Sequence, residues 1–201
     1  MILTILNEDR ERSRGHGLPI SVLKAQASSL GVPIMLRSAT WDDYESVFIE
    51  ALVELKSMGI AVGVFGDIDL EQHREWVHRV CGGVGVTPYH PLWSQERRSL
   101  LDELLREGFE ATIVAVKKGT LDASFLGRKL TSDAIGELET AGIDASGELG
   151  EYHTVVTNGP LFTKPLRIST LKVHERDGYL FLDVSLPNGN LCLDSTDIRG
   201  G

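Results

Sequence analysis

The chain has 201 residues, of which 42% are hydrophobic and 24% charged, so it can bury a core and its composition excludes a disordered protein. Acidic residues outnumber basic residues by 29 to 20, which gives a net charge of -9 at pH 7. Because phosphate-binding surfaces usually carry a basic excess, this balance argues against nucleic acid or an anionic membrane as the main partner. A small anionic ligand held by a few groups remains compatible with it.

The two cysteines, Cys81 and Cys192, are too few for a disulfide scaffold or a zinc knuckle. No apolar run approaches the roughly 20 residues that a membrane-spanning helix needs. Residues 1–6 are too short for a signal peptide and have no basic segment before them. We therefore expect a reduced, soluble and cytoplasmic protein.

The first half of the chain alternates strand patterns with helix patterns. In chain order we expect a strand, a charged loop, a helix, a strand, a helix, a strand and a helix over residues 2–6, 7–17, 20–30, 33–36, 44–58, 60–65 and 70–83. Thr40 and Asp43 are placed to cap the second helix. The run at 60–65 is apolar throughout, which is typical of a strand buried on both faces of a parallel sheet. This order predicts an α/β fold with a doubly wound parallel sheet.

The pattern changes after Gly85, where Pro88 and Pro91 bracket a predicted loop. A helix that Ser94 caps, a strand, a second helix and a second strand are expected over residues 94–108, 111–116, 131–142 and 154–157. Apolar residues then alternate strictly from 180 to 186, and Asp177-Gly178 is a hairpin signal. We therefore expect a smaller α+β carboxy-terminal domain, with domains over residues 1–88 and 89–201.

The first candidate site is Gly66-Asp67-Ile68, at the carboxyl end of the predicted strand 60–65, where open α/β sheets bind ligands. Gly66 would let a ligand approach the backbone closely. Asp67 could accept a hydrogen bond from a ribose hydroxyl, orient a metal-bound water, or cap the next helix, a role for which Asp69 competes.

The second candidate is the loop 147–154, in which two carboxylates, Glu148 and Glu151, are three residues apart and flanked by glycines. The pair could bind an ammonium group, hold a metal or position a nucleophile. His153 and Thr154 add a titratable group and a hydroxyl. The alternative is a solvated acidic loop that leads into a strand.

The third candidate is the pair Arg128 and Lys129 beside Gly127, which could contact phosphate or form a solvated turn. The spacing of His73 and His78 does not match the i, i+4 pattern of metal-binding helices, and no metal site is predicted.

Taken together, these segments resemble the diphthine–ammonia ligase family, which are N-type ATP pyrophosphatases of the adenine nucleotide alpha hydrolase group. The matching residues lie in order at 26–33, 66–68, 74 with 76, 91–93, 125–128, 147–154 and 158–162. The stretch 147–162 is the most specific of them.

The resemblance implies an enzyme that activates a carboxylate with ATP and Mg²⁺ to an acyl-adenylate, from which ammonia displaces AMP. In eukaryotes and archaea the carboxylate belongs to diphthine on translation elongation factor 2, a candidate protein partner, and a homodimer stays open. By resemblance, Gly66, Asp67, Gly127 and Arg128 contact the nucleotide. Glu148 and Glu151 are the catalytic candidates, and the substrate-binding candidates are Gly150, Tyr152, His153 and Thr154.

The sequence departs from the family in two places. The family opens with a strand and a Ser-Gly-Gly-Lys-Asp-Ser loop that wraps the ATP phosphates, and this loop is not found here. We expect an amino-terminally truncated chain that binds ATP weakly and exposes a sheet edge, because backbone amides of such a loop form the main phosphate cradle. The family usually has glycine where this sequence has Leu149.

Two alternative functions stay open at this point. One is a bacterial relative that acts on another carboxylate or nucleotide, for instance in cobalamin salvage. The other is a non-enzymatic binding module that keeps only the carboxy-terminal pocket.

Overall fold

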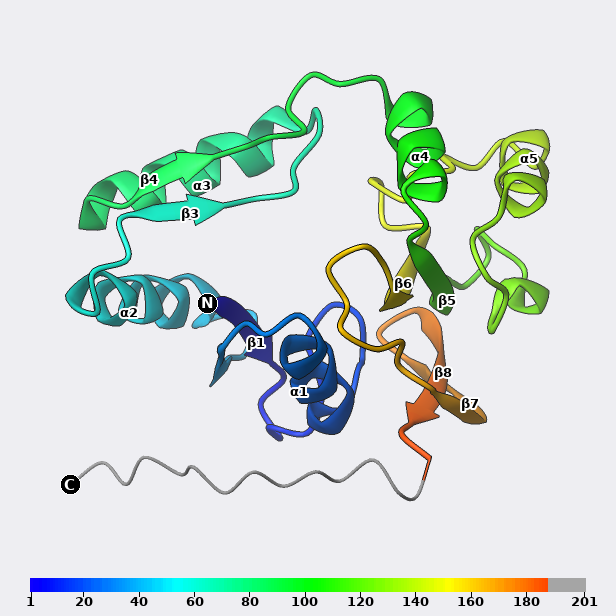
Figure 1. The fold of residues 1–201 in the computed structure, drawn as a ribbon, viewed down its shortest axis with the longest axis horizontal. Helices are drawn as coiled ribbons and strands as arrows, with labels where there is room; N and C mark the ends of the chain where they lie inside the picture. The colour runs from blue at the N-terminus through cyan, green and yellow to red at the C-terminus, as the bar shows by residue number, and fades with distance from the viewer. Residues whose placement is uncertain (188–201) are drawn as a thin grey trace.

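A computed structural model describes residues 1–187, and its ribbon is drawn in Figure 1. The elements of the first half are β1 (Ile2–Leu6), α1 (Ile20–Ser29), β2 (Ile34–Ser38), α2 (Tyr44–Ser57), β3 (Val62–Val64), α3 (Glu71–Val84) and β4 (Thr87–Tyr89). Those of the second half are α4 (Arg97–Arg106), β5 (Glu110–Lys117), a 3-10 turn η1 (Ala123–Phe125), α5 (Ser132–Thr140), β6 (Tyr152–Asn158), β7 (Ser169–Arg176) and β8 (Tyr179–Ser185). Cys192, which the sequence analysis expects to be reduced, lies outside the described residues.

The first half is an α/β unit with parallel strands, as predicted. β1 pairs in parallel with β2, and β3 pairs in parallel with β4. Helices α2 and α3 pack on these strands through a shared apolar core that includes Phe48, Leu52, Val77 and the fully buried Cys81. The strand β4 was not expected, because its proline at position 88 favours a loop in sequence.

The expectation that the run 60–65 is buried on both faces was wrong. Val62 is 52% exposed and Val64 is 68% exposed. Within residues 1–187 the parallel strands form two separate pairs, so each of these strands, β3 included, has a strand neighbour on one edge only.

The predicted pairing of Thr40 and Asp43 is confirmed, whereas the predicted cap at Ser94 is wrong. At the start of α2 the Asp43 backbone N–H donates to the Thr40 hydroxyl at 3.3 Å, and the Asp43 carboxylate accepts from the Thr40 backbone N–H and hydroxyl, which is the reciprocal arrangement of a capping box. At α4 the capping residue is Glu96, whose side chain accepts from the backbone N–H groups of Arg98 and Ser99, while Ser94 lies in the preceding turn. A glutamate is a less common cap than serine, which is why the pattern favoured position 94.

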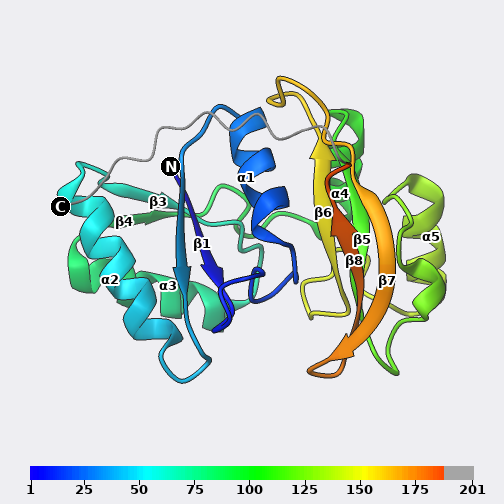
Figure 2. The same cartoon turned by 90° about the horizontal axis from the view of Figure 1, so that it is seen from below.

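The second half is an antiparallel sheet of order β6-β5-β8-β7, with α5 packed on one face (Figure 2). The predicted hairpin is confirmed at Asp177-Gly178, where both residues have positive φ. This is the smaller α+β unit that the sequence predicts. No described helix is long and apolar enough to cross a membrane.

Helix α1 joins the two halves into one structure. Figure 2 shows α1 between the β1–β2 pair and the antiparallel sheet. Its buried Val22 and Leu23 share a core with Val114 of β5 and Val155 of β6. The Gln26 side chain also donates a hydrogen bond of 2.7 Å to the Val156 carbonyl. The loop after β1 and the strand ends of the first half are thereby held against the second half.

Candidate functional site

Asp67 lies just beyond the carboxyl end of β3, where its carboxylate faces two histidines. One oxygen is 3.2 Å from Nδ1 of His90, and the other is 3.7 Å from Nδ1 of His73. The His90 side chain is only 5% exposed, and its ring lies between those of Phe65 and His78. The capping alternative for Asp67 is wrong, because no side chain caps α3.

Asp67 and Glu148 line the same cavity, which has a volume of about 590 Å³. Gly66 also lines it, and a side chain added at Gly66 would meet no atom within 4 Å, so the backbone is open to a ligand there. The rest of the wall is largely aromatic and comprises Trp41, Tyr44, Phe48, Phe65 and Trp76. The structure therefore brings the first candidate site together with one carboxylate of the second.

Arg97 connects the two halves beside this cavity, at a second cavity of about 440 Å³ that Gly66 and Glu148 also line. Its guanidinium binds the carboxylate of Asp69, with Nε 2.8 Å from Oδ2, and also pairs with the carboxylate of Asp144. Asp144 in turn accepts from the backbone N–H groups of Ser146 and Glu148, each at 3.1 Å. The chain Asp69–Arg97–Asp144 thus fixes the turn that carries Glu148 beside Asp67.

The surroundings of Glu148 change the pKa of its carboxyl group. It is partly buried, and this burial raises the pKa of its carboxyl above the ordinary value of 4.5. The nearby carboxylates of Asp69, Asp144 and Asp67 raise the pKa further, whereas Arg97 lowers it. A carboxyl group with a raised pKa is suited to accept a proton near neutral pH.

Glu151 lies deeper in the loop than Glu148. The residue is 8% exposed, and its Oε2 is buried with no hydrogen-bond partner among the described residues. Its charge helps to raise the pKa of the Tyr152 and Tyr179 phenols, for which burial is the larger cause. The solvated-loop alternative therefore does not apply to Glu151.

The other residues of the loop hold its shape. The Tyr152 hydroxyl is buried and donates to the carbonyl of Ala145 at 2.6 Å, and the Gly150 carbonyl accepts from the Tyr179 hydroxyl at the same distance. Both groups are thereby engaged in bonds within the protein. Thr154, the next strand residue after His153, lines a cavity of about 530 Å³.

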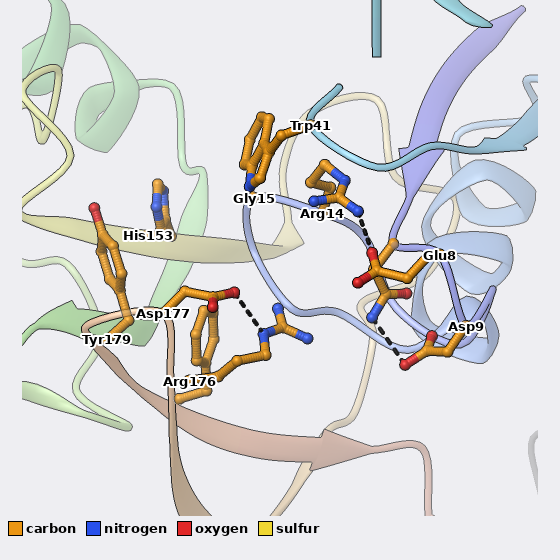
Figure 3. Close-up of a pocket in the computed structure, with 11 residues that line it drawn as sticks. Glu8, Asp9, Arg14, Gly15, Trp41, His153, Arg176, Asp177 and Tyr179 are labelled. Atoms are coloured by element: carbon orange, nitrogen blue, oxygen red, sulfur yellow. Dashed lines mark hydrogen bonds and ion pairs between the residues drawn. The ribbon is translucent and has the colours of Figure 1, made fainter. Parts of the chain in front are cut away.

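His153 lines a separate cavity of about 420 Å³, between the loop after β1 and the β7–β8 hairpin (Figure 3). Arg14, Trp41 and Arg176 also line it, so Trp41 borders both this cavity and the one at Asp67. Burial, and to a smaller extent the nearby His16, lower the pKa of the His153 imidazole to about 4, so the ring is neutral at pH 7.

Gly127 and Arg128 lie apart from these cavities. Arg128 forms two hydrogen bonds of 2.7 Å with Glu137 of α5, and its guanidinium lies 4.6 Å over the Phe125 ring. Neither residue lines the cavity that holds Asp67 and Glu148. The structure thus places the third candidate on the α5 side of the antiparallel sheet.

Sequence reasoning missed Arg14, Trp41, His90, Arg97 and Arg176. None belongs to a recognised motif in the chain. Arg14, His90 and Arg97 act through neighbours that are distant in sequence, whereas Arg176 contacts the nearby Asp177 and Phe181. A useful signal would have been Arg14 in the charged segment 7–17, because a charged loop after a strand of an α/β sheet lies where ligands bind.

A parallel α/β unit whose strand ends face an acidic loop from an antiparallel unit is the arrangement in which open α/β sheets commonly bind ligands. Comparison with known proteins specifies the class. The diphthamide synthase N-terminal domain matches residues 1–88, and the diphthamide synthase C-terminal domain matches residues 96–185. The chain belongs to the diphthamide synthase family.

The similar curated proteins are all named diphthine–ammonia ligase. The one from Danio rerio is 28% identical over 170 residues, which cover 81% of this chain and 66% of the relative. The one from Bos taurus is 30% identical over 158 residues (70% of this chain and 58% of the relative), and the one from Homo sapiens is 30% identical over 127 residues (60% and 46%). The chain thus spans about half to two thirds of the length of these relatives.

Proposed function

We propose that this protein takes part in the ATP-dependent amidation of a carboxylate with ammonia, of the kind that converts diphthine to diphthamide. The observation that carries the proposal is the meeting of Asp67 and Glu148 in one cavity, because an amidating enzyme needs its nucleotide and its proton acceptor side by side. The names of the relatives support the same reaction.

In this proposal the nucleotide binds in the aromatic cavity at the end of β3. The flat side chains of Trp41, Tyr44 and Trp76 suit the stacking of an adenine ring. The open backbone at Gly66 admits the ribose, and Asp67 accepts from a ribose hydroxyl. Nucleotide contacts by Gly127 and Arg128 remain a prediction that the position of these residues does not support.

Mg²⁺ enters the proposal only together with the polyphosphate. Within residues 1–187, no group of three or more His, Cys, Asp or Glu side chains is arranged to hold a metal ion. Mg²⁺ commonly uses one or two carboxylates together with substrate phosphates, and Asp67 is placed to supply one of them. The ion would neutralise charge on the phosphates.

Two carboxylates share the handling of ammonia in this proposal. The buried and unpartnered Oε2 of Glu151 attracts an ammonium ion, since an unpaired buried oxygen gains a hydrogen bond there. Glu148, with its raised pKa, accepts the proton that converts ammonium to ammonia. The ammonia nitrogen then bonds to the activated acyl carbon and loses a proton to solvent, the bond from this carbon to the phosphate oxygen breaks, and AMP leaves.

The proposal is tested by measuring AMP formed from ATP in the presence of ammonium and diphthine-bearing elongation factor 2, with the Homo sapiens relative as positive control. We expect Glu151→Gln to reduce ammonia-dependent AMP formation while the free energy of unfolding changes by less than about 1 kcal/mol. A large fall in melting temperature with unchanged AMP formation would instead assign Glu151 a structural role.

The 201-residue sequence contains no Ser-Gly-Gly-Lys-Asp-Ser segment, and we propose that this chain binds ATP more weakly than the relative. Isothermal titration of both proteins tests this, and equal affinities would refute it. Turnover with a carboxylate other than diphthine would favour the alternative that this protein is a bacterial relative that acts on another substrate. Ligand binding without any AMP formation would favour the binding module, and sedimentation would test for a homodimer.

A further inference from the structure

The cavity of about 420 Å³ that His153 lines contains two arginines that the proposed reaction does not use. Figure 3 shows the Arg14 and Arg176 side chains directed into the space between the loop after β1 and the β7–β8 hairpin. They come from segments more than 160 residues apart in the sequence, so the cavity exists only when both halves are assembled.

Arg14 is held rigidly and retains free hydrogen-bonding capacity. Its side chain is only 9% exposed, and its guanidinium lies 4.8 Å from the centroid of the Trp41 ring. Its Nη2 donates to Glu8 and to the Ala39 carbonyl, but its Nε is buried with no partner in the described residues. Because this nitrogen is buried, a ligand oxygen in the cavity would bind at Nη1, which forms no hydrogen bond within the described residues and is not buried.

Arg176 lines the opposite wall, where its side chain is 29% exposed. Its guanidinium lies 4.9 Å from the centroid of the Phe181 ring, and its buried Nε has no hydrogen-bond partner among residues 1–187. The nearest carboxylate oxygen, on Asp177, is 3.5 Å from this nitrogen. Both arginines also act on Glu8, since their charges help to lower the pKa of its carboxyl, after a larger effect of its backbone hydrogen bond.

The acidic residues of the cavity lie farther out than the arginines. The side chains of Glu8 and Asp177 are 67% and 79% exposed, and Asp9 is exposed as well. The interior is therefore cationic and the rim anionic. The anionic rim would repel a multiply charged phosphate. A ligand with one carboxylate and one cationic group instead matches the cavity, with its carboxylate in the cationic interior and its cationic group at the anionic rim.

We propose that this cavity binds a zwitterionic ligand, with the ligand's carboxylate on Arg14 and Arg176 and its cationic group at the rim beside Glu8 and Asp177. Arginine forks suit a carboxylate because they donate paired hydrogen bonds to its two oxygens. The inference goes beyond the proposed function, because neither Asp67 nor Glu148 lines this cavity.

The test measures binding without ATP, so that its outcome is independent of any turnover. The amide signals of Gly15 and Asp177 are followed by ¹H–¹⁵N NMR during titration with 4-aminobutanoate, butanoate, butylamine or inorganic phosphate. We expect saturable shifts with 4-aminobutanoate at millimolar concentrations, weaker binding of butanoate, and no shifts with butylamine or phosphate.

Variants then assign the contacts. Arg176→Gln should weaken the binding of 4-aminobutanoate about tenfold, and Arg14→Lys should weaken it by less, because lysine keeps the charge but not the fork. Asp177→Asn should remove the preference for 4-aminobutanoate over butanoate. The matched control is Arg106→Gln, at an exposed arginine of α4, which should leave binding unchanged.

Three results would overturn the proposal. They are the absence of shifts with both carboxylates, a preference for phosphate, and unchanged affinity in folded Arg176→Gln. If Arg14→Lys fails to fold, Arg176→Gln and Asp177→Asn still decide the question, because the Arg176 side chain is only partly buried and that of Asp177 is exposed. Glu151→Gln should lose AMP formation and keep its binding of 4-aminobutanoate, because Glu151 does not line this cavity. The two measurements therefore test the proposed reaction and this binding site independently.

Discussion

Replacing Arg97 by methionine should destabilise the protein and misplace the acidic loop. Arg97 lies at the start of α4 and joins Asp69 of the first half to Asp144 of the second. Methionine keeps the apolar stem and removes every donor. Asp144 would keep its bonds from the backbone of Ser146 and Glu148 but lose its cationic partner.

The magnitude follows from the exposure of the two pairs. Asp144 is 16% exposed, so its pair with Arg97 counts as a partly buried charged hydrogen bond of about 1.5–3 kcal/mol. Asp69 is 40% exposed, and its pair contributes about 0.2–1 kcal/mol. Removing a positive charge from a helix N-terminus returns about 0.5 kcal/mol. The net loss is therefore about 1–3.5 kcal/mol, which lowers Tm by roughly 2–14 °C.

Urea denaturation followed by circular dichroism measures this loss, and Arg106→Met is the matched control at an exposed arginine of the same helix. A double-mutant cycle of Arg97→Met with Asp144→Asn should give a coupling free energy of about 1–3 kcal/mol. The reasoning would be refuted if Arg97→Met lay within about 0.5 kcal/mol of the unsubstituted protein, or if the cycle showed no coupling.

Three further outcomes are expected. Since the folded-state pKa of His153 is about 4, below its ordinary 6.5, stability should fall as pH decreases from about 6.5 towards 4; chemical denaturation across this range should show a smaller fall in His153→Asn. Glu148 has the opposite effect, because its pKa is higher in the folded state than in the unfolded state: the free energy of unfolding should decrease as pH rises above 4.5. Glu148→Gln should remove this dependence in the same measurement. Gly17→Ala should cost about 1–3 kcal/mol in urea denaturation, because Gly17 has positive φ and its added Cβ would lie 2.7 Å from Phe181, whereas Gly15→Ala, with open space around it, should be near neutral.

The order of elements was predictable from the sequence because periodicity and glycine positions reflect local chemistry. The strand at 2–6, the helix at 44–57 and the hairpin at 177–178 are where the pattern places them. The burial of β3 was not predictable in this way. A continuous apolar run indicates that a strand is suited to the interior of a sheet. The exposure of its side chains depends on which strands and helices pack against it, and β3 pairs only with β4.

The candidate site was predictable where a motif carries it. Glu148 and Asp67 do line one cavity, but sequence could not show that Arg97 holds them there, because Asp69, Arg97 and Asp144 are separated by 28 and 47 residues. The same limit applies to Arg14 and Arg176. A contact between distant segments leaves no local periodicity, and so it is visible only in the folded chain.

Strand β3, which has a strand neighbour on one edge only, also affects the tendency of this protein to self-associate at high concentration. Its free edge offers a row of N–H and C=O groups beside the apolar side chains of Val62 and Val64, and another extended chain can add to such a row. Self-association should therefore increase steeply during concentration and purification. A charged residue in place of Val64 would be the simplest way to keep the protein monodisperse for crystallisation.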